Sequence, residues 1–149
     1  MTVAGILATK GRDVVTTQPH RTLTEVANML IDKGIGAIVV TGANGEVLGI
    51  ISERDIVRAI ARHNPAALDH AVSRYMTTKV ITTCERATVD SLMEMMTAGR
   101  FRHVPVVEND RLVGLVSIGD VVKHHVADIE TEERALKEYI ASAGVIAPS

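Results

Sequence analysis

Two short stretches of the chain carry the same polar signature: GIISERD, from Gly49 to Asp55, and GLVSIGD, from Gly114 to Asp120. Each places a serine three residues before an aspartate, where a strand is expected to give way to a helix. An aspartate in the first helical turn is stabilised by the helix dipole and can accept hydrogen bonds from two vicinal ribose hydroxyls. Asp55 and Asp120 are therefore candidate ribose contacts. Ser52 and Ser117 are candidate donors to ribose or phosphate oxygens.

The same spacing has a purely structural interpretation. Serine and aspartate at a strand-to-helix junction often do no more than cap the helix, with no ligand involved. Two copies in register favour ligand binding, because the motif then recurs in a matching structural context. The capping interpretation stays open.

The signature belongs to a longer internal repeat. Residues 22–40 align with residues 88–107 at an offset of 66, which becomes 65 at the signature. Each copy predicts the order β-α-β-β-α, beginning with the strands VVTT (Val14 to Thr17) and KVITT (Lys79 to Thr83). Thr22 with Glu25 predicts a capping box, whereas Thr88 predicts a cap alone. Each cap begins the first helix of its repeat, and Gly34 and Gly99 predict where these two helices end.

This pattern predicts a mixed α/β (α+β) fold of two repeats, at residues 12–62 and 75–126. Residues 63–74 are the expected linker and 127–149 a helical tail, with a charged helix from about Glu130 to Ala143. A unit of about 60 residues buries little surface alone, so the copies should pack through their sheets and form one folding unit within residues 1–126.

Composition excludes several classes of function. A net charge of −2 and the absence of Trp argue against a DNA-binding protein. The apolar runs are too short to span a membrane, and a single cysteine, Cys84, together with the lack of a signal sequence, predicts a cytoplasmic protein. Neither phosphate-loop motif GxxxxGK nor GxGxxG is present, and adjacent His124 and His125 point to different helix faces, so we expect no enzyme activity and no metal site.

With these motifs the chain resembles a tandem pair of CBS domains, a module that senses adenine nucleotides. The resemblance rests on the β-α-β-β-α order, the strand ending VPVV, the repeated signature and the run SERDIVRA. It implies a pseudo-twofold pair with one ligand cleft per repeat, a homodimer, and no chemistry by the pair itself. The implied ligands are AMP, ADP, ATP, NAD or S-adenosylmethionine. It also implies an adenine pocket formed by Val15, Thr16, Ile35, Gly36, Ile50, Ile81, Thr82, Phe101 and Leu115.

The resemblance further implies that basic residues of one repeat reach the phosphate held by the other. The second repeat offers Arg100, Arg102 and His103 to a ligand anchored by Asp55, and Arg54 adds to this charge. The first repeat offers only Gly36 and Ala37, so we expect the Asp55 cleft to prefer mono- or diphosphates and the Asp120 cleft to bind phosphate less well. Arg100 and Arg102 could instead be ordinary solvated residues.

The sequence thus favours a regulatory module that binds an adenine nucleotide and signals to an effector protein. A ligand-free dimerisation scaffold with vestigial clefts is the main alternative. An S-adenosylmethionine sensor and a weak nucleotide hydrolase or NAD-using protein are further alternatives.

Overall fold

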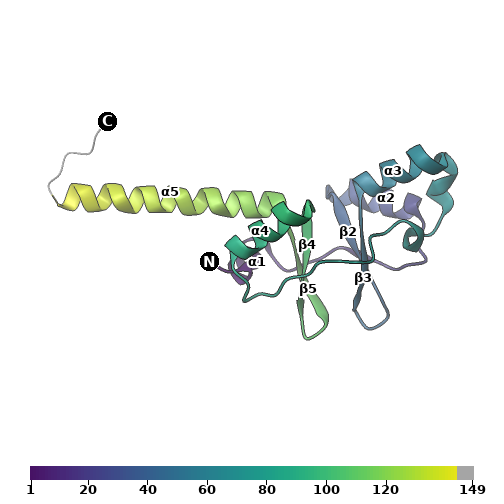
Figure 1. Ribbon diagram of the computed structural model, residues 1–149, viewed down its shortest axis with the longest axis horizontal. Coiled ribbons are helices and arrows are strands. Elements are labelled where there is room, and N and C mark those ends of the chain that lie inside the picture. Colours follow the sequence, from purple (N-terminus) through teal and green to yellow (C-terminus); the bar gives the residue numbers. More distant parts are fainter. Residues whose placement is uncertain (144–149) are drawn as a thin grey trace.

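The computed structural model describes residues 1–143 and shows two lobes, each built around a β-hairpin flanked by helices (Figure 1). The first half of the chain forms α1 (Val3–Lys10), β1 (Thr16–Thr17), α2 (Leu23–Lys33), β2 (Ala37–Thr41), β3 (Val47–Ser52) and α3 (Glu53–His63). The linker forms the 3-10 helices η1 (Pro65–Asp69) and η2 (Val72–Arg74). The second half forms α4 (Val89–Gly99), β4 (His103–Glu108), β5 (Arg111–Ser117) and α5 (Ile118–Ser142). The predicted mixed fold of two repeats is confirmed.

The two repeats have separate sheets. In the first, β1 runs parallel to β2, and β2 pairs antiparallel with β3; in the second, β4 pairs antiparallel with β5. The strand predicted from Lys79 to Thr83 was wrong for all but its last residue. Thr83 alone pairs with β4, accepting from the Val107 N–H at 2.9 Å and donating to the Pro105 carbonyl at 3.0 Å. Residues 79–81 instead line a cavity between the repeats.

Each repeat has its own core, and each core is completed by the segment that precedes the other repeat. The first core contains Leu23 and Ile51 and takes in Val72 from the linker. The second contains Val104 and takes in Leu7 from α1. These side chains are fully or almost fully buried. The helix that comes first in the chain therefore packs on the second repeat, and the linker packs on the first.

Two glycines of the repeated signature permit this crossed packing. A Cβ atom on Gly49 would lie 2.6 Å from the sulfur of Met76 and 2.9 Å from the backbone oxygen of Thr77. A Cβ atom on Gly114 would lie 2.7 Å from a methyl carbon of Leu7. Glycine at these places lets the crossing segments lie directly against β3 and β5.

The chain from Ser117 onward forms one long helix where the sequence predicts two. No glycine or proline interrupts residues 120–142, so the helix α5 continues through the predicted tail helix and projects beyond the lobes (Figure 1). Residues 144–149 of the predicted tail lie outside the described residues.

The helix caps differ from the prediction in two details. Thr22 accepts a hydrogen bond from the Glu25 N–H at 3.2 Å, but the capping box is incomplete because the Glu25 carboxylate turns to Arg21 at 3.1 Å. Gly34 adopts the left-handed conformation after α2, as expected, with φ of 62°. After α4 the left-handed residue is Arg100, with φ of 56°, and Gly99 is the last helical residue.

The crossed packing predicts that Gly49→Ala destabilises the protein by about 1–3 kcal/mol, because the added methyl group overpacks against the backbone of Thr77. Gly119→Ala is the matched control, because its Cβ would meet its nearest neighbour at an ordinary 3.6 Å. Urea unfolding followed by circular dichroism measures both. Equal stability of the two variants would contradict the packing described.

Candidate functional site

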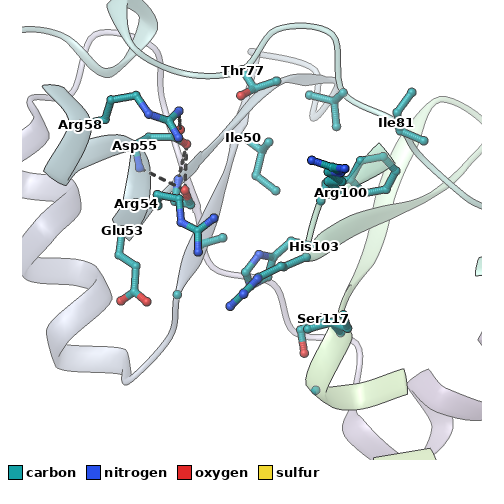
Figure 2. A pocket seen from close by; sticks show the side chains of 18 of the residues that line it. Ile50, Glu53, Arg54, Asp55, Arg58, Thr77, Ile81, Arg100, His103 and Ser117 are labelled. Atoms are coloured by element: carbon teal, nitrogen blue, oxygen red, sulfur yellow. Dashed lines mark hydrogen bonds and ion pairs between the residues drawn. The ribbon is translucent and has the colours of Figure 1, made fainter. Parts of the chain in front are cut away.

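A cavity of about 530 Å³ lies between the two repeats. Five segments line it: the start of β2, the junction of β3 and α3, the chain that enters the second repeat, the residues around the start of β4, and the N-terminus of α5. Figure 2 shows Asp55 and Arg58 on one side of the opening, with Arg100 and Ile81 on the other. The cavity therefore draws residues from both repeats.

Asp55 is held by a capping box at the start of α3. Its Oδ2 atom accepts from the Ser52 N–H at 2.8 Å and from the Ser52 hydroxyl at 3.0 Å, and its own N–H donates to that hydroxyl at 3.2 Å. Its Oδ1 atom lies 3.7 Å from Arg58, and the side chain is 18% exposed. One carboxylate oxygen is thus occupied by the cap, while the other keeps acceptor capacity toward the cavity.

Positive side chains outnumber carboxylates around the cavity. Glu53 and Asp55 are its acidic residues. The cationic residues lining it are Arg54, Arg58, Lys79, Arg100 and Arg102. An anion entering the cavity would meet this excess of charge at short range, in a partly enclosed space where electrostatic interactions are screened less than in bulk water.

His103 lies in the same cavity, and its pKa is below the usual value of 6.5. Burial is the main cause of the lowered pKa, and the nearby charges of Lys10 and Arg102 add to it. The carboxylates of Asp120 and Glu53 act in the opposite direction without reversing the shift. His103 is therefore neutral at pH 7, and it can serve as a hydrogen-bonding group beside a ligand.

The structure brings together part of the predicted adenine pocket. Gly36, Ile50, Ile81 and Phe101 line the cavity, as do the predicted polar residues Ser52, Arg54, Asp55, Arg100, Arg102, His103 and Ser117. Their roles toward a ligand remain predictions.

The other predicted pocket residues lie elsewhere. Thr16 pairs with β2, Val15 packs against the first core, and Thr82 is exposed. Ile35 lines an adjoining apolar groove of about 510 Å³ between α2 and α3, which shares Gly36 and Glu53 with the cavity. Leu115 lies in β5, where its carbonyl accepts a hydrogen bond from Lys10.

Several lining residues were not predicted from the sequence, namely Glu53, Arg58, Thr77, Lys79, Val80, Ile118 and Gly119. Arg58 could have been found, because it lies three residues after Asp55 and shares its helix face. Thr77 to Val80 could not, because they reach the cavity only through the crossed packing. Thr77 exchanges backbone hydrogen bonds with Ile50, at 3.0 and 2.9 Å, which fixes this segment beside the signature.

Asp120 forms the equivalent capping box at the start of α5. Its Oδ2 atom accepts from the Ser117 N–H at 2.8 Å, and its own N–H donates to the Ser117 hydroxyl at 3.1 Å. Burial is the largest influence on its pKa and acts to raise it. Hydrogen bonds from Lys10 and Ser117 together outweigh burial and hold the pKa of Asp120 below its usual value.

Two further properties bear on the chemistry. Within residues 1–143, no three His, Cys, Asp or Glu side chains gather closely enough to hold a metal ion. In the same part of the chain, no helix combines the length and apolar character needed to cross a bilayer.

Comparisons with known proteins identify the repeats. The family model "CBS domain" matches residues 6–62 and 72–127. The CBS-domain containing protein ATU1752 from Agrobacterium tumefaciens is similar in structure, with a TM-score of 0.81 and 52% identity over 84% of this chain and 99% of that one. An uncharacterized 17.7 kDa protein of Acidianus ambivalens is 33% identical over 95% of this chain and 88% of its own length.

A third relative was crystallised with ligands. The CBS domain pair of protein MJ0100, in complex with 5-methylthioadenosine and S-adenosyl-L-methionine, has a TM-score of 0.77 to this chain and is 27% identical. The match covers 86% of this chain and 98% of that one.

The lowered pKa of His103 predicts an acid-dependent loss of stability. As pH falls below about 6.5, the unfolded chain takes up a proton at His103 while the folded protein resists it, so the free energy of unfolding decreases. His103→Gln should therefore lose less stability than the wild type between pH 7.5 and 5.5. Denaturant unfolding at both pH values measures this difference, with the other histidines common to both proteins. An equal loss in both proteins would show that His103 titrates normally.

Proposed function

The chain belongs to the CBS domain family, and on that premise we propose that it is a regulatory module that binds an adenine nucleotide in the cavity at Asp55. Binding would alter the module's contacts with an effector protein. The single observation that carries this proposal is the convergence of three chemistries in one cavity. A half-buried carboxylate at Asp55, a guanidinium group at Arg102 and apolar side chains at Ile50 and Ile81 all line it.

These groups suit the three parts of a nucleotide. The base would lie between Ile50 and Ile81, and the ribose hydroxyls would donate to the free oxygen of Asp55. The phosphate would lie toward Arg100 and Arg102, which can form charge-assisted hydrogen bonds with it. The N-terminus of α5 borders the same cavity, and the positive end of its helix dipole would favour an anion there.

Charge distinguishes among the adenine-containing ligands. Protein MJ0100 binds 5-methylthioadenosine and S-adenosyl-L-methionine, which supports an adenosine group as the shared element. S-adenosylmethionine carries a positive sulfonium, and the excess of arginine and lysine around this cavity disfavours that charge. We therefore propose AMP, ADP, ATP or NAD as the ligand class.

The proposal assigns binding to the cavity and no catalysis. A general base must be free to take a proton from the reacting group. One oxygen of Asp55 is held by Ser52, and the other is the proposed acceptor of the ribose hydroxyls, so neither is left to take a proton from a reacting group. Weak nucleotide hydrolysis would require turnover that disappears in Asp55 variants.

A ligand-free scaffold is the second candidate, and one observation favours it. The complete capping box between Ser52 and Asp55 accounts for both side chains without any ligand. In that case the repeated signature would serve the fold alone, and the chain would function only by dimerisation.

We also propose that the chain acts as a cytoplasmic homodimer. The apolar groove between α2 and α3 opens to solvent beside Ile31, which is 78% exposed, and Val57, which is 66% exposed. Side chains of this kind gain stability when a second surface covers them. An effector protein would then read the state of the dimer.

Arg102→Gln tests the nucleotide proposal. Removing one charge-assisted phosphate contact should weaken AMP binding by about 10–100-fold, because such a bond contributes roughly 1.5–3 kcal/mol. Binding of adenosine should change little, since it carries no phosphate. Isothermal titration calorimetry measures both, and Arg111→Gln, at the exposed tip of the β4–β5 hairpin, is the matched control.

Asp55→Asn separates the nucleotide proposal from the scaffold. It should abolish the stabilisation of about 2.7 kcal/mol that AMP gives at 100 times its dissociation constant. Thr88→Ala removes a helix cap away from the cavity and should leave that stabilisation intact. Absence of any stabilisation of the wild type by AMP, ADP, ATP, NAD or S-adenosylmethionine would leave the scaffold as the function.

Val57→Lys tests the dimer. A charge placed in the apolar groove should shift the protein to a monomer in light scattering coupled to size exclusion. Arg111→Gln serves again as the control and should leave the mass unchanged. A wild type that is monomeric at high protein concentration would contradict the proposal.

A further inference from the structure

Lys10 occupies the second copy of the repeated signature. Its Nζ atom lies 2.5 Å from Asp120 Oδ2 and donates a second hydrogen bond, of 2.6 Å, to the carbonyl of Leu115. The side chains of Lys10 and Asp120 are 35% and 22% exposed, so the pair is partly shielded from water. Lys10 thus binds two acceptors of the second signature at the same time.

The first copy is arranged differently. At the offset of 65, Leu115 corresponds to Ile50 and Asp120 to Asp55. The Ile50 carbonyl accepts from the backbone N–H of Thr77 at 2.9 Å, where the Leu115 carbonyl accepts from a lysine side chain. The cation nearest to Asp55 in the described chain is Arg58, at a looser 3.7 Å. The two copies of the signature therefore have equivalent capping hydrogen bonds, but they differ in the group that bonds to the carbonyl and in the cation beside the aspartate.

The position of Lys10 is set by the fold. It is the last residue of α1, whose Ile6 and Leu7 are buried in the second core. Gly11 ends the helix with φ of 104°, and its N–H donates to the Leu7 carbonyl at 2.7 Å. Leu7, one turn before Lys10, packs against Gly114 of β5, so the helix holds the start of the lysine side chain near that strand.

Lys10 compensates the charge of the carboxylate that a ribose at the second signature would use. Asp120 Oδ2 receives both the Ser117 N–H and the Lys10 ammonium, so a hydroxyl group donating to Oδ1 would meet a carboxylate already paired with a cation, or would have to replace that charge-assisted bond with a neutral one. Charge-assisted bonds are the stronger of the two, so this exchange opposes ligand binding.

We propose that Lys10 is a built-in competitor that closes the Asp120 cleft, so that each chain binds one nucleotide, in the cavity at Asp55. The inference rests on the proposed function, because it requires that the open cavity binds an adenine nucleotide. It makes Lys10 the residue that determines how many ligands the pair holds. Loss of the lysine should strengthen binding at Asp120 by about 10–100-fold.

Calorimetric titration with AMP tests this stoichiometry. The wild type should bind one AMP per chain, and Lys10→Met should bind two. Lys33→Met is the matched control, because Lys33 is likewise the last residue of its helix, is exposed, and should leave the count at one. Lys10→Gln is a second variant in case the methionine disturbs folding, which thermal melting of each protein monitors.

The double variant Asp55→Asn/Lys10→Met locates the second site. Asp55→Asn alone should abolish AMP binding, and adding Lys10→Met should restore one site per chain. Two sites in the wild type, or one site in both Lys10 variants, would overturn the role of Lys10 while leaving the proposed function intact. No binding by any of the proteins would overturn the proposed function, and the inference with it.

Discussion

The crossed packing of the two repeats is the constraint on which the rest of the structure depends. Neither core is complete without the segment that precedes the other repeat, since Leu7 fills the second core and Val72 the first. The chain that leaves α1 for the first repeat therefore crosses the signature of the second repeat. The linker, on its way to the second repeat, crosses the signature of the first. This crossing places Thr77 beside the Asp55 junction and Lys10 beside the Asp120 junction. The cavity between the repeats is a consequence of how the cores are filled.

The same constraint explains why a symmetric repeat gives the two signature aspartates different surroundings. The two capping boxes are nearly identical, with hydrogen bonds of 2.8 Å from each serine N–H to its aspartate. What differs is the crossing segment: an extended chain meets β3, whereas a helix ending in lysine meets β5. Arginines before β4 then add charge to the open cavity, where the first repeat supplies small residues. The two repeats thus carry the same capped aspartate, and the flanking segment determines whether a lysine is bonded to it.

Much of the fold could be predicted from local signals, because the repeat, the caps and the turn residues act over a few positions. Thr22 caps α2, Gly34 ends it, and the signature aspartates lie in the first turns of α3 and α5, as the sequence predicts. The roles of Lys10 and Thr77 could not be predicted, since they depend on contacts between segments far apart in the chain. The sequence predicts two helices where α5 is continuous, although no glycine or proline between them breaks a helix. Val15 and Thr82 were transferred by analogy to an adenine pocket and lie away from the cavity.

A crystal structure of the protein grown with AMP would show whether one signature anchors a nucleotide while the other is held by the chain itself. We expect an arrangement with the ribose hydroxyls on Asp55, the phosphate beside Arg102, and Lys10 still bonded to Asp120. A nucleotide bound at Asp120 with Lys10 displaced, or a cavity at Asp55 that stays empty at saturating AMP, would contradict it.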